Sequence, residues 1–377
     1  MSDSVKPKLI WVNNFLFLST FLVAVIVVPW YGVVHGYSAG LWFALLICFS
    51  YCGLSITAGY HRLWAHKSYN AHWSMRFIYA LGGAFALQNS ALHWSSDHRV
   101  HHKHVDAPEK DPYAATKGLW YSHIGWMLRE YQPERYADYA NCRDLQRDAI
   151  VMWQHKYYVE LAILMNIGVP LVIGLFAGDV WGALLLVGFL RLVLSHHTTF
   201  FINSLAHFWG SQPYTDRNTA RDNGVLALFT FGEGYHNFHH LFENDYRNGI
   251  RWWQFDPTKW LINGLSYLKL ASDLRRSPAD RIEKMKAKMT LKKAQTKLAA
   301  LPQATLSREL LEQEYELLLT RISDYYQAKK ACIEAKQEAL QSGIKTKLEN
   351  VETHYDAMKR SLGEQRRRWR QLTAQYA

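Results

Sequence analysis

Nine of the 18 histidines lie in short clusters whose spacing suits metal binding. Two clusters have the form HxxHH, in DHRVHHK and GEGYHNFHH, a third is the pair in HRLWAH, and the ninth histidine lies four residues after Asn203 in NSLAH. Positions i, i+3 and i+4 share one face of a helix, which predicts that each HxxHH triplet directs three imidazoles to one place. The nine are His61, His66, His98, His101, His102, His207, His236, His239 and His240.

Neutral imidazole binds Zn, Cu, Fe and Ni, and nine ligands exceed what one ion can hold, so the clusters predict two metal ions. Structural zinc is disfavoured because no cysteine accompanies the clusters and four ligands would close a zinc site. A pair of irons with room for O2 is the alternative that the clusters favour. Ligand type alone does not distinguish iron from the other metals that imidazole binds.

Four apolar stretches that could position these clusters have about 20 residues or more, the length that crosses the hydrocarbon of a bilayer. They are residues 9–34, 41–60, 157–177 and 180–204. The short connections at residues 35–40 and 178–179 predict two hairpins. Lysine and arginine lie before the first span, after the second span and before the third span, at the ends away from these short connections. The positive-inside rule therefore predicts a multi-pass membrane protein with both termini and all the histidine clusters on the cytoplasmic side.

Two further apolar segments, residues 73–90 and 252–271, carry charged side chains, and we expect them to lie at the membrane surface. A crossing at residues 73–90 would separate two histidine clusters. In the fourth span, Arg191, His196 and His197 are costly in lipid, which predicts positions that face the helix bundle or serve a function. For the two histidines, support of the metal ligands and ordinary packing are both open.

The composition changes after residue 277, from aromatic and apolar residues to charge, Leu and Ala, which predicts two domains, 1–277 and 278–377. Apolar residues of the second domain recur at heptad spacing, with Pro302 and Gly343 as expected breaks. We expect two or three helices packed as a hairpin or as an oligomeric coiled coil. The predicted fold class is all-α: a membrane domain of four transmembrane helices, a cytosolic helical cap that carries the metal site, and a C-terminal helical or coiled-coil extension.

The formal net charge of +11 fits cytoplasmic loops that obey the positive-inside rule, and it also fits an anionic cofactor handle on a substrate. No nucleic-acid-binding motif accompanies it. Cys48, Cys52, Cys142 and Cys332 are scattered, so no disulfide framework is predicted. The GEG at residues 232–234 lacks the third glycine and the βαβ unit of a dinucleotide site. We therefore expect any electrons for redox chemistry to come from a separate protein.

With these motifs, residues 11–267 resemble the integral-membrane fatty acid desaturases, and within them the acyl-CoA delta-9 (stearoyl-CoA) type in a bacterial form. The motifs HRLWAH, QNSALHWSSDHRVHHK, NSLAH and GEGYHNFHHLF carry the resemblance. It implies an oxidoreductase in which the nine histidines bind two irons and an Asn at the place of Asn203 approaches one iron through water. It also implies O2-dependent delta-9 desaturation of stearoyl-CoA or palmitoyl-CoA, in a bacterial inner membrane, with no catalytic residue beyond the metal ligands.

The same resemblance suggests substrate contacts. Gln88, Asn89, Trp94 and Thr199 match positions that line the bend of an acyl tunnel or approach the acyl carbonyl, with ordinary packing as the alternative. Arg99 matches a residue near the CoA phosphates, and the alternative is a solvated or lipid-facing arginine. Phe200 departs from the family pattern, which more often has Trp there. The match is therefore weaker for the substrate contacts than for the metal ligands.

Three other functions stay open. A desaturase of acyl chains in phospholipid and a fatty acyl hydroxylase would use the same motifs, since both reactions begin with the same hydrogen abstraction. A membrane scaffold or metal transporter is the alternative from another class, although transport favours ionisable residues in the middle of spans. The expected partners are a ferredoxin or similar carrier with its NAD(P)H reductase, membrane lipid and a second copy of the chain.

Overall fold

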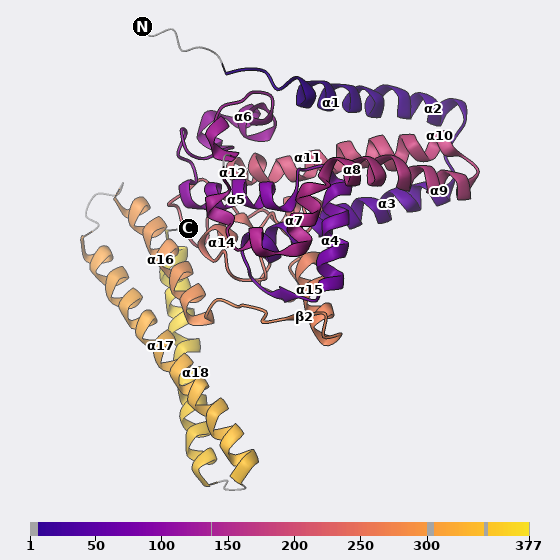
Figure 1. Ribbon diagram of the computed structural model, residues 1–377. Coiled ribbons are helices and arrows are strands. Elements are labelled where there is room, and N and C mark those ends of the chain that lie inside the picture. The colour runs from indigo at the N-terminus through magenta and orange to yellow at the C-terminus, as the bar shows by residue number, and fades with distance from the viewer. Residues whose placement is uncertain (1–6, 137, 300–304, 343–345, 377) are drawn as a thin grey trace. The chain divides into compact units, whose positions relative to one another are not determined.

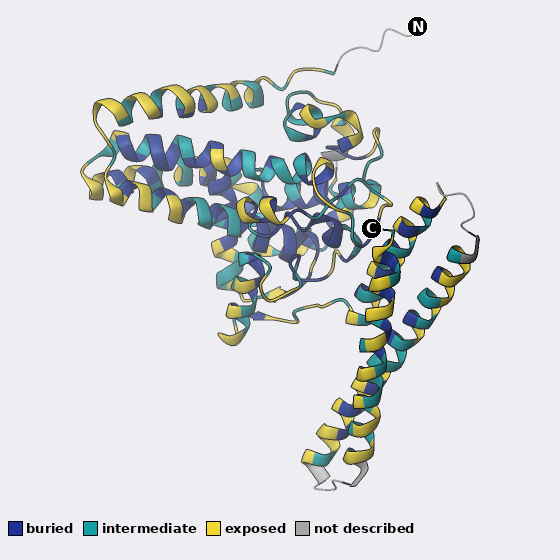
Figure 2. Cartoon of the chain, turned by 180° about the vertical axis from the view of Figure 1, so that it is seen from behind, coloured by how far each residue is buried: buried dark blue, intermediate teal, exposed yellow. Residues whose placement is uncertain are grey.

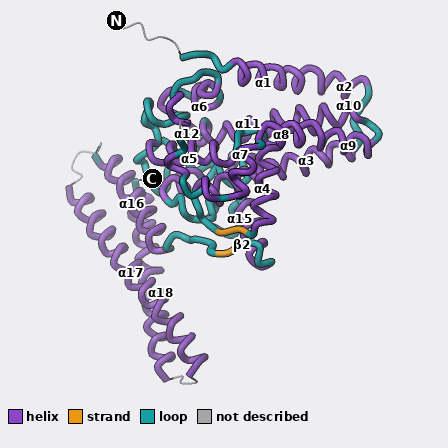
Figure 3. The backbone as a smooth tube through the Cα atoms, viewed as in Figure 1, coloured by secondary structure: helices purple, strands orange, loops and turns teal. Residues whose placement is uncertain are grey.

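The computed structural model describes residues 7–136, 138–299, 305–342 and 346–376. Over these residues the chain is mostly helical, with several loops in the first unit, as Figures 1 and 3 show. Its contacts divide it into two compact units. One comprises the chain up to Ser211 with Arg217–Arg276, and the other comprises Gln212–Asp216 with Ser277–Ala377.

Four helices of the first unit are long and apolar enough to cross a membrane: Trp11–Val34, Ala39–Ala65, Tyr158–Ala177 and Val180–Phe208. This confirms the predicted all-α fold with four membrane helices. Each span contains a π-helical segment. Their parts are α1 (Trp11–Leu22), η1 (Val23–Val27), α2 (Val28–Val34), α3 (Ala39–Leu54), η2 (Ser55–Ala65), α8 (Tyr158–Ile163), η8 (Leu164–Gly168), α9 (Val169–Ala177), α10 (Val180–Ala183), η9 (Leu184–Leu190), α11 (Arg191–Asn203) and α12 (Leu205–Phe208).

The second and fourth spans continue further than their apolar stretches predict, to Ala65 and Phe208. These extensions carry His61 and His207 at the ends of the two helices. Figure 2 shows many exposed residues along the outer faces of the spans and a concentration of buried residues where the spans meet the remaining helices. The apolar spans therefore also serve as rigid supports for the histidines.

Two shorter helices, α4 (Trp73–Ala86) and α15 (Pro257–Tyr267), run across the direction of the spans (Figure 1). They flank a two-stranded antiparallel sheet of β1 (Asn70–Ala71) and β2 (Ala271–Ser272). These helices fall within the segments that were expected at the membrane surface.

Helix α4 packs against η2 through small residues. A Cβ atom built on Gly59 of η2 would lie 2.6 Å from Tyr79 Cβ, and one on Gly83 of α4 would lie 2.2 Å from Tyr60 Cε1. Tyr79 and Tyr60 are both buried, so neither ring can move out into solvent to make room. The close approach fixes the part of the second span that precedes His61.

We expect Gly59→Ala to destabilise the protein by about 1–3 kcal/mol, because the added methyl overpacks this contact. Gly264→Ala on α15 is the matched control, since a Cβ there meets nothing within 4 Å and alanine favours helix. Thermal unfolding in detergent would measure both variants. Equal midpoints for the two would contradict the packing argument.

The remaining helices of the first unit form a cap at the histidine-bearing ends of the spans. They are α5 (Ala91–His104), α6 (Leu119–His123), α7 (Ala149–Lys156), α13 (Gly224–Phe229) and α14 (His236–Leu241), with the 3-10 turns η3 (Ala115–Lys117), η4 (Gly125–Met127), η5 (Pro133–Tyr136), η6 (Ala140–Cys142) and η7 (Leu145–Arg147). The buried core joins spans and cap, from Val28 and Leu41 to Leu92 and Leu145.

In the described residues of the second unit there are three helices, α16 (Ala279–Leu298), α17 (Thr305–Ser342) and α18 (Thr346–Ala374). Its core includes Leu298, Leu311, Ile322, Leu362 and Trp369. Long C-terminal helices are therefore confirmed. The expected breaks at Pro302 and Gly343 lie outside the described residues, and the domain boundary at residue 277 and the oligomeric coiled coil stay predictions.

Candidate metal centre

The nine clustered histidines come together from four elements. His61 lies on η2 and His66 directly follows it; α5 carries His98, His101 and His102; α12 carries His207; and α14 carries His236, His239 and His240. They form two groups, and within each group the possible ligand atoms all lie within 4.8 Å of one another. The first group is His61, His66, His98, His102 and His239, and the second is His101, His207, His236 and His240.

The structure corrects one detail of the sequence prediction, because each HxxHH triplet is divided between the groups. His98 and His102 join the first group, whereas His101 joins the second. In the other triplet, His236 and His240 join the second group and His239 the first. Adjacent residues on a helix point about 100° apart. The two neighbouring histidines of each triplet therefore diverge, and both triplets serve two centres.

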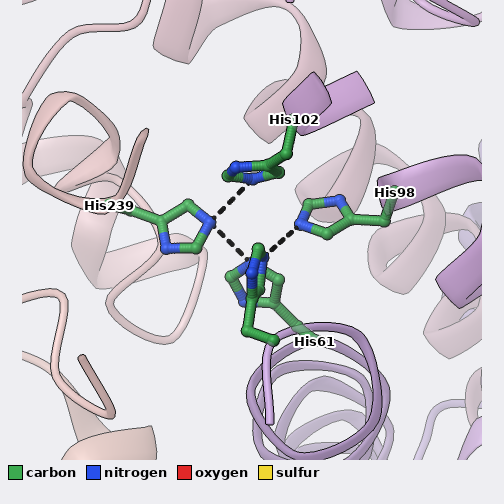
Figure 4. Close-up of side chains that lie close together, drawn as sticks. His61, His98, His102 and His239 are labelled. Atoms are coloured by element: carbon green, nitrogen blue, oxygen red, sulfur yellow. Dashed lines mark hydrogen bonds between the residues drawn. The ribbon is translucent and has the colours of Figure 1, made fainter. Parts of the chain in front are cut away.

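Within the groups, the Nε2 atoms face one another at close range. His61 Nε2 and His102 Nε2 each lie 3.0 Å from His239 Nε2, and His66 Nε2 lies 2.8 Å from His98 Nε2. Figure 4 shows the labelled imidazoles of the first group turned toward one another. In the second group, His236 Nε2 lies 3.2 Å from His207 Nε2 and 3.1 Å from His240 Nε2.

The opposite ring nitrogens contact oxygen atoms that surround the groups. The Nδ1 atoms of His61, His101 and His102 lie 2.9, 2.8 and 3.0 Å from carboxylate oxygens of Glu233, Asp111 and Glu243, respectively. Hydroxyl oxygens of Tyr113 and Thr219 lie 3.2 and 2.8 Å from Nδ1 of His98 and His207.

The carboxylates at the Nδ1 atoms decide which ring nitrogen carries the proton. An ionised carboxylate only accepts hydrogen bonds, so the facing Nδ1 carries the proton and Nε2 carries a lone pair. Inward-facing lone pairs repel one another unless a cation lies between them. The donor set is therefore that of two imidazole-bound metal ions, and the histidine clusters fit the di-iron site of a desaturase.

Six clustered histidines outside the spans are held neutral. Burial, followed by the nearby imidazoles, lowers the pKa of His66, His98, His236, His239 and His240 well below the usual value. Burial also lowers the pKa of His102, to about 4. Neutral imidazole is the form that binds metal. These six side chains are therefore in the metal-binding form at neutral pH.

One carboxylate, Glu233, links the first group to a buried ion-pair network. Its Oε2 lies 2.9 Å from His61 Nδ1 and accepts a 2.6 Å hydrogen bond from Asn248 Nδ2. Its Oε1 accepts from Arg62 Nη2 at 2.8 Å, and Arg62 also pairs with Asp256. Burial opposes ionisation of Glu233, but His61 and Arg62 outweigh it and lower its pKa. Glu233 is therefore a fixed anion behind His61.

We expect Glu233→Gln to weaken metal binding by about 10- to 100-fold, the usual cost of losing the partner of a histidine ligand. Glu243→Gln is the matched control. It removes the same contact from His102, but the Glu243 side chain is 47% exposed and that of Glu233 only 2%. An exposed contact of this kind contributes up to about 1 kcal/mol, which would change the metal affinity by less than about sixfold. Competition with a chelator would measure the metal affinity of both variants. Equal losses of affinity would contradict the expected difference between Glu233→Gln and Glu243→Gln.

A cavity of about 310 Å³ lies beside the first group, and several predicted substrate residues line it. The indole of Trp94 forms one wall and stacks on His98, with ring centroids 4.8 Å apart. Gln88 Nε2 donates a 2.8 Å hydrogen bond to Thr199 Oγ1 across the cavity wall. Asn89, Phe200 and Asn203 also line it. The cavity brings together four of the five predicted substrate residues.

Arg99 is the exception, since it is not among the residues that line this cavity. Its guanidinium pairs with both carboxylate oxygens of Asp144 and donates to the carbonyls of Trp64, Ala65 and Asn141. These five hydrogen bonds use all its N–H groups. The arrangement argues against a direct phosphate contact, because each N–H already has an acceptor within the protein.

The polar residues of the fourth span face the bundle, as their cost in lipid predicts. Arg191 donates to Phe85 O at 2.6 Å and to Asn166 Oδ1 at 2.7 Å. His196 Nε2 lies 3.1 Å from Leu87 O, and His197 Nδ1 lies 3.0 Å from His123 Nε2. Neither histidine has a hydrogen bond to a clustered histidine among the described residues. Packing therefore accounts for them better than support of the metal ligands.

Sequence reasoning missed the acidic residues around the histidines. Glu233 lies within GEGYHNFHH, three residues before His236, and that position alone could have marked it as a partner of a ligand. Asp111 lies ten residues after His101 in an irregular loop, and Glu243 follows the last motif by three residues. No spacing rule assigns these acids to particular histidines.

Known proteins resemble this chain over the same region. Residues 37–271 match the fatty acid desaturase family. "Acyl-CoA desaturase 1" of Saccharomyces cerevisiae is 47% identical over 248 residues, which cover 66% of this chain and 48% of the yeast protein. "Stearoyl-CoA desaturase 5" of Bos taurus is 37% identical over 64% of this chain and 73% of the bovine protein. "sn-2 palmitoyl-lipid 9-desaturase" of Nostoc is 34% identical over 72% of this chain and 93% of that protein.

The matched region contains all nine histidines and the last three spans, and it begins after the end of the first span. The chain spans about half the length of the yeast relatives that it matches. The family match, the membrane helices and the geometry of the histidines all indicate the same family. The chain belongs to the fatty acid desaturase family.

Proposed function

We propose that this protein is an O2-dependent acyl-CoA desaturase that introduces a double bond at the delta-9 position of a saturated long-chain acyl group. This proposal rests on the two histidine groups and on the cavity that lies beside the first of them. Trp94 forms one wall of that cavity and stacks on His98. The names of the yeast and bovine relatives support the acyl-CoA substrate. Stearoyl-CoA and palmitoyl-CoA are the proposed substrates.

The nine histidines would hold two irons, and Asn203 would approach one of them through water. Bound iron would supply the O2 activation that is needed to remove hydrogen from an unactivated methylene. Acid–base catalysis alone cannot break such a C–H bond. The overall reaction removes two hydrogens from adjacent carbons, takes two electrons and two protons, and converts O2 into two molecules of water. Two electrons must therefore reach the site for each double bond.

The protein's own contribution is to position the chain and exclude water. Trp94 and Phe200 present apolar rings to the cavity, while the hydrogen bond between Gln88 and Thr199 ties α11 to the segment after α4. One methylene more or less changes binding by only about 1–3 kcal/mol. The shape of the cavity, rather than any polar contact, must therefore select the carbon that reacts.

A second candidate is desaturation of acyl chains already attached to lipid. It is favoured by the Nostoc relative, whose name specifies a palmitoyl lipid and which this chain covers over 93% of its length. The placement of Arg99 is consistent with this candidate, because all its N–H groups are used within the protein. A fatty acyl hydroxylase would use the same metal centre.

The electron donor of this proposal is a separate ferredoxin or similar carrier with its NAD(P)H reductase. The proposed location is a bacterial inner membrane, with the histidine groups and both termini on the cytoplasmic side, as the positive flanks of the spans favour. Self-association through the C-terminal helices is proposed as well, and removal of residues 278–377 with no change in oligomer size would contradict it.

Incubation of membranes that contain the protein with labelled stearoyl-CoA, O2 and a reduced ferredoxin system tests the function. Early oleoyl-CoA that is absent with His98→Ala would establish the acyl-CoA desaturase. Label that becomes unsaturated only after it enters phospholipid would support the second candidate, and a hydroxy acid would indicate the hydroxylase. A reaction that runs on NADPH without the carrier would contradict the proposed donor.

A further inference from the structure

A group of large apolar side chains outside the four spans is exposed on the first unit. Helix α13 exposes Val225, Leu228 and Phe229, the last at 59%. The loop before α15 exposes Trp252 and Trp253, at 87% and 62%. An apolar surface of this kind marks a site of contact with a protein or a membrane. We refer to these five residues together with Phe231 as the apolar wedge.

The position of Phe231 shows at what depth the wedge lies beside the second span. Its ring lies 5.5 Å from that of Phe49, and it covers Gly53 so closely that a Cβ there would lie 2.0 Å from Phe231 Cε2. Gly53 is 14 residues along the helix from Ala39, about 21 Å at 1.5 Å per residue. The hydrocarbon of a bilayer is about 30 Å thick. With the outer edge of the hydrocarbon at Ala39, Phe231 packs against the span inside the hydrocarbon.

A second contact places the beginning of α15 near the edge of the hydrocarbon. Thr57 Oγ1 and Thr258 Oγ1 share a 2.7 Å hydrogen bond, and Thr258 Oγ1 also donates to Phe231 O. Thr57 is 18 residues from Ala39, about 27 Å by the same measure. The wedge thus has its phenylalanine within the hydrocarbon and the start of α15 where the hydrocarbon meets the headgroups.

The two exposed tryptophans lie on a braced loop. Lys259 Nζ donates to the carbonyls of Gly249, Arg251 and Gln254, at 2.6, 2.8 and 3.2 Å. Asp256 Oδ2 accepts from Gly249 N at 3.0 Å. These bonds hold the loop at both ends, so the exposure of Trp252 and Trp253 follows from its structure. Tryptophan is enriched where a bilayer meets water.

We propose that the apolar wedge inserts into the lipid leaflet on the histidine side without crossing the membrane, with α13 among the acyl chains and Trp252 and Trp253 at headgroup level. At the depth of Phe231, side chains that face away from the protein would contact the acyl chains of the lipid. Interfacial helices bury their apolar face by about 5–10 Å, which matches the position beside Gly53. The proposal does not depend on the proposed reaction.

The wedge would also connect the membrane to the metal centre. Phe231 is two residues from Glu233, the carboxylate behind His61, and five from His236 of the second histidine group. Backbone hydrogen bonds from Gly232 N to Ala227 O and from Asn223 N to Gly234 O fold this segment onto α13. Lipid that holds α13 would therefore help to hold the last histidine motif.

Site-directed spin labelling of the full chain in phosphatidylcholine and phosphatidylglycerol vesicles tests the insertion. Leu228→Cys and Trp253→Cys carry the label, and labelling is selective because the four native cysteines are buried. Phe15→Cys, on the exposed face of the first span, is the control inside the bilayer. Asn244→Cys, an exposed polar position after α14, is the control in water.

Relaxation by O2 should exceed relaxation by a soluble nickel chelate at residue 228, as at residue 15. Residue 253 should give an intermediate ratio, and residue 244 the opposite one. A label at residue 228 that meets the nickel chelate as readily as one at residue 244 would overturn the proposal. Shielding of residue 228 from both reagents would also overturn it, since it would show that protein covers the wedge.

Discussion

We expect replacement of His66 or His240 by alanine to abolish the proposed desaturation and to remove metal from one histidine group, while the other group keeps its own. Each substitution deletes one inward Nε2 from a different group. We expect activity below about 0.1% of the unmodified protein, which corresponds to about 4 kcal/mol of lost transition-state stabilisation. Iron content of the purified protein, with activity on labelled stearoyl-CoA, measures both effects.

His104→Ala is the matched control for these variants. His104 ends the same helix as His98, His101 and His102 but belongs to neither group. We expect it to keep both irons and near-normal activity. Full iron content in His66→Ala or His240→Ala would contradict the assignment of these ligands, and loss of iron in His104→Ala would show that iron content reports folding rather than ligation.

We expect Leu16→Trp to occupy space in the cavity and to slow turnover without removing metal. Leu16 lines the cavity from α1, a helix that carries none of the clustered histidines. A larger side chain there competes with the acyl chain for space. We expect kcat/KM to fall by about 100-fold or more, equivalent to about 2.7 kcal/mol, with iron content unchanged.

Leu18→Trp makes the same change two residues further along α1, at a position that is exposed and does not line the cavity. It should leave kcat/KM within about twofold, because surface substitutions usually change little. Steady-state kinetics on both variants would separate the two cases. Equal activity in Leu16→Trp and Leu18→Trp would show that the acyl chain lies elsewhere.

Much of the fold and of the candidate site could be predicted from local patterns. Runs of about 20 apolar residues identify membrane helices because the bilayer sets their length. The histidine motifs identify metal ligands because imidazoles four residues apart share a helix face, as His98 and His102 do. The substrate residues came only from resemblance to the family, and of these the structure gives Arg99 a different set of contacts.

The sequence by itself determined the number and type of the candidate ligands, since nine histidines in short motifs are a local property and exceed what one ion can hold. Only the tertiary structure decided how the histidines divide, because His101 and His102 diverge about 100° on one helix and reach different groups. It likewise decided which acids support them. Glu233 reaches His61 across 172 residues of chain, through a packing of helices that no local spacing encodes.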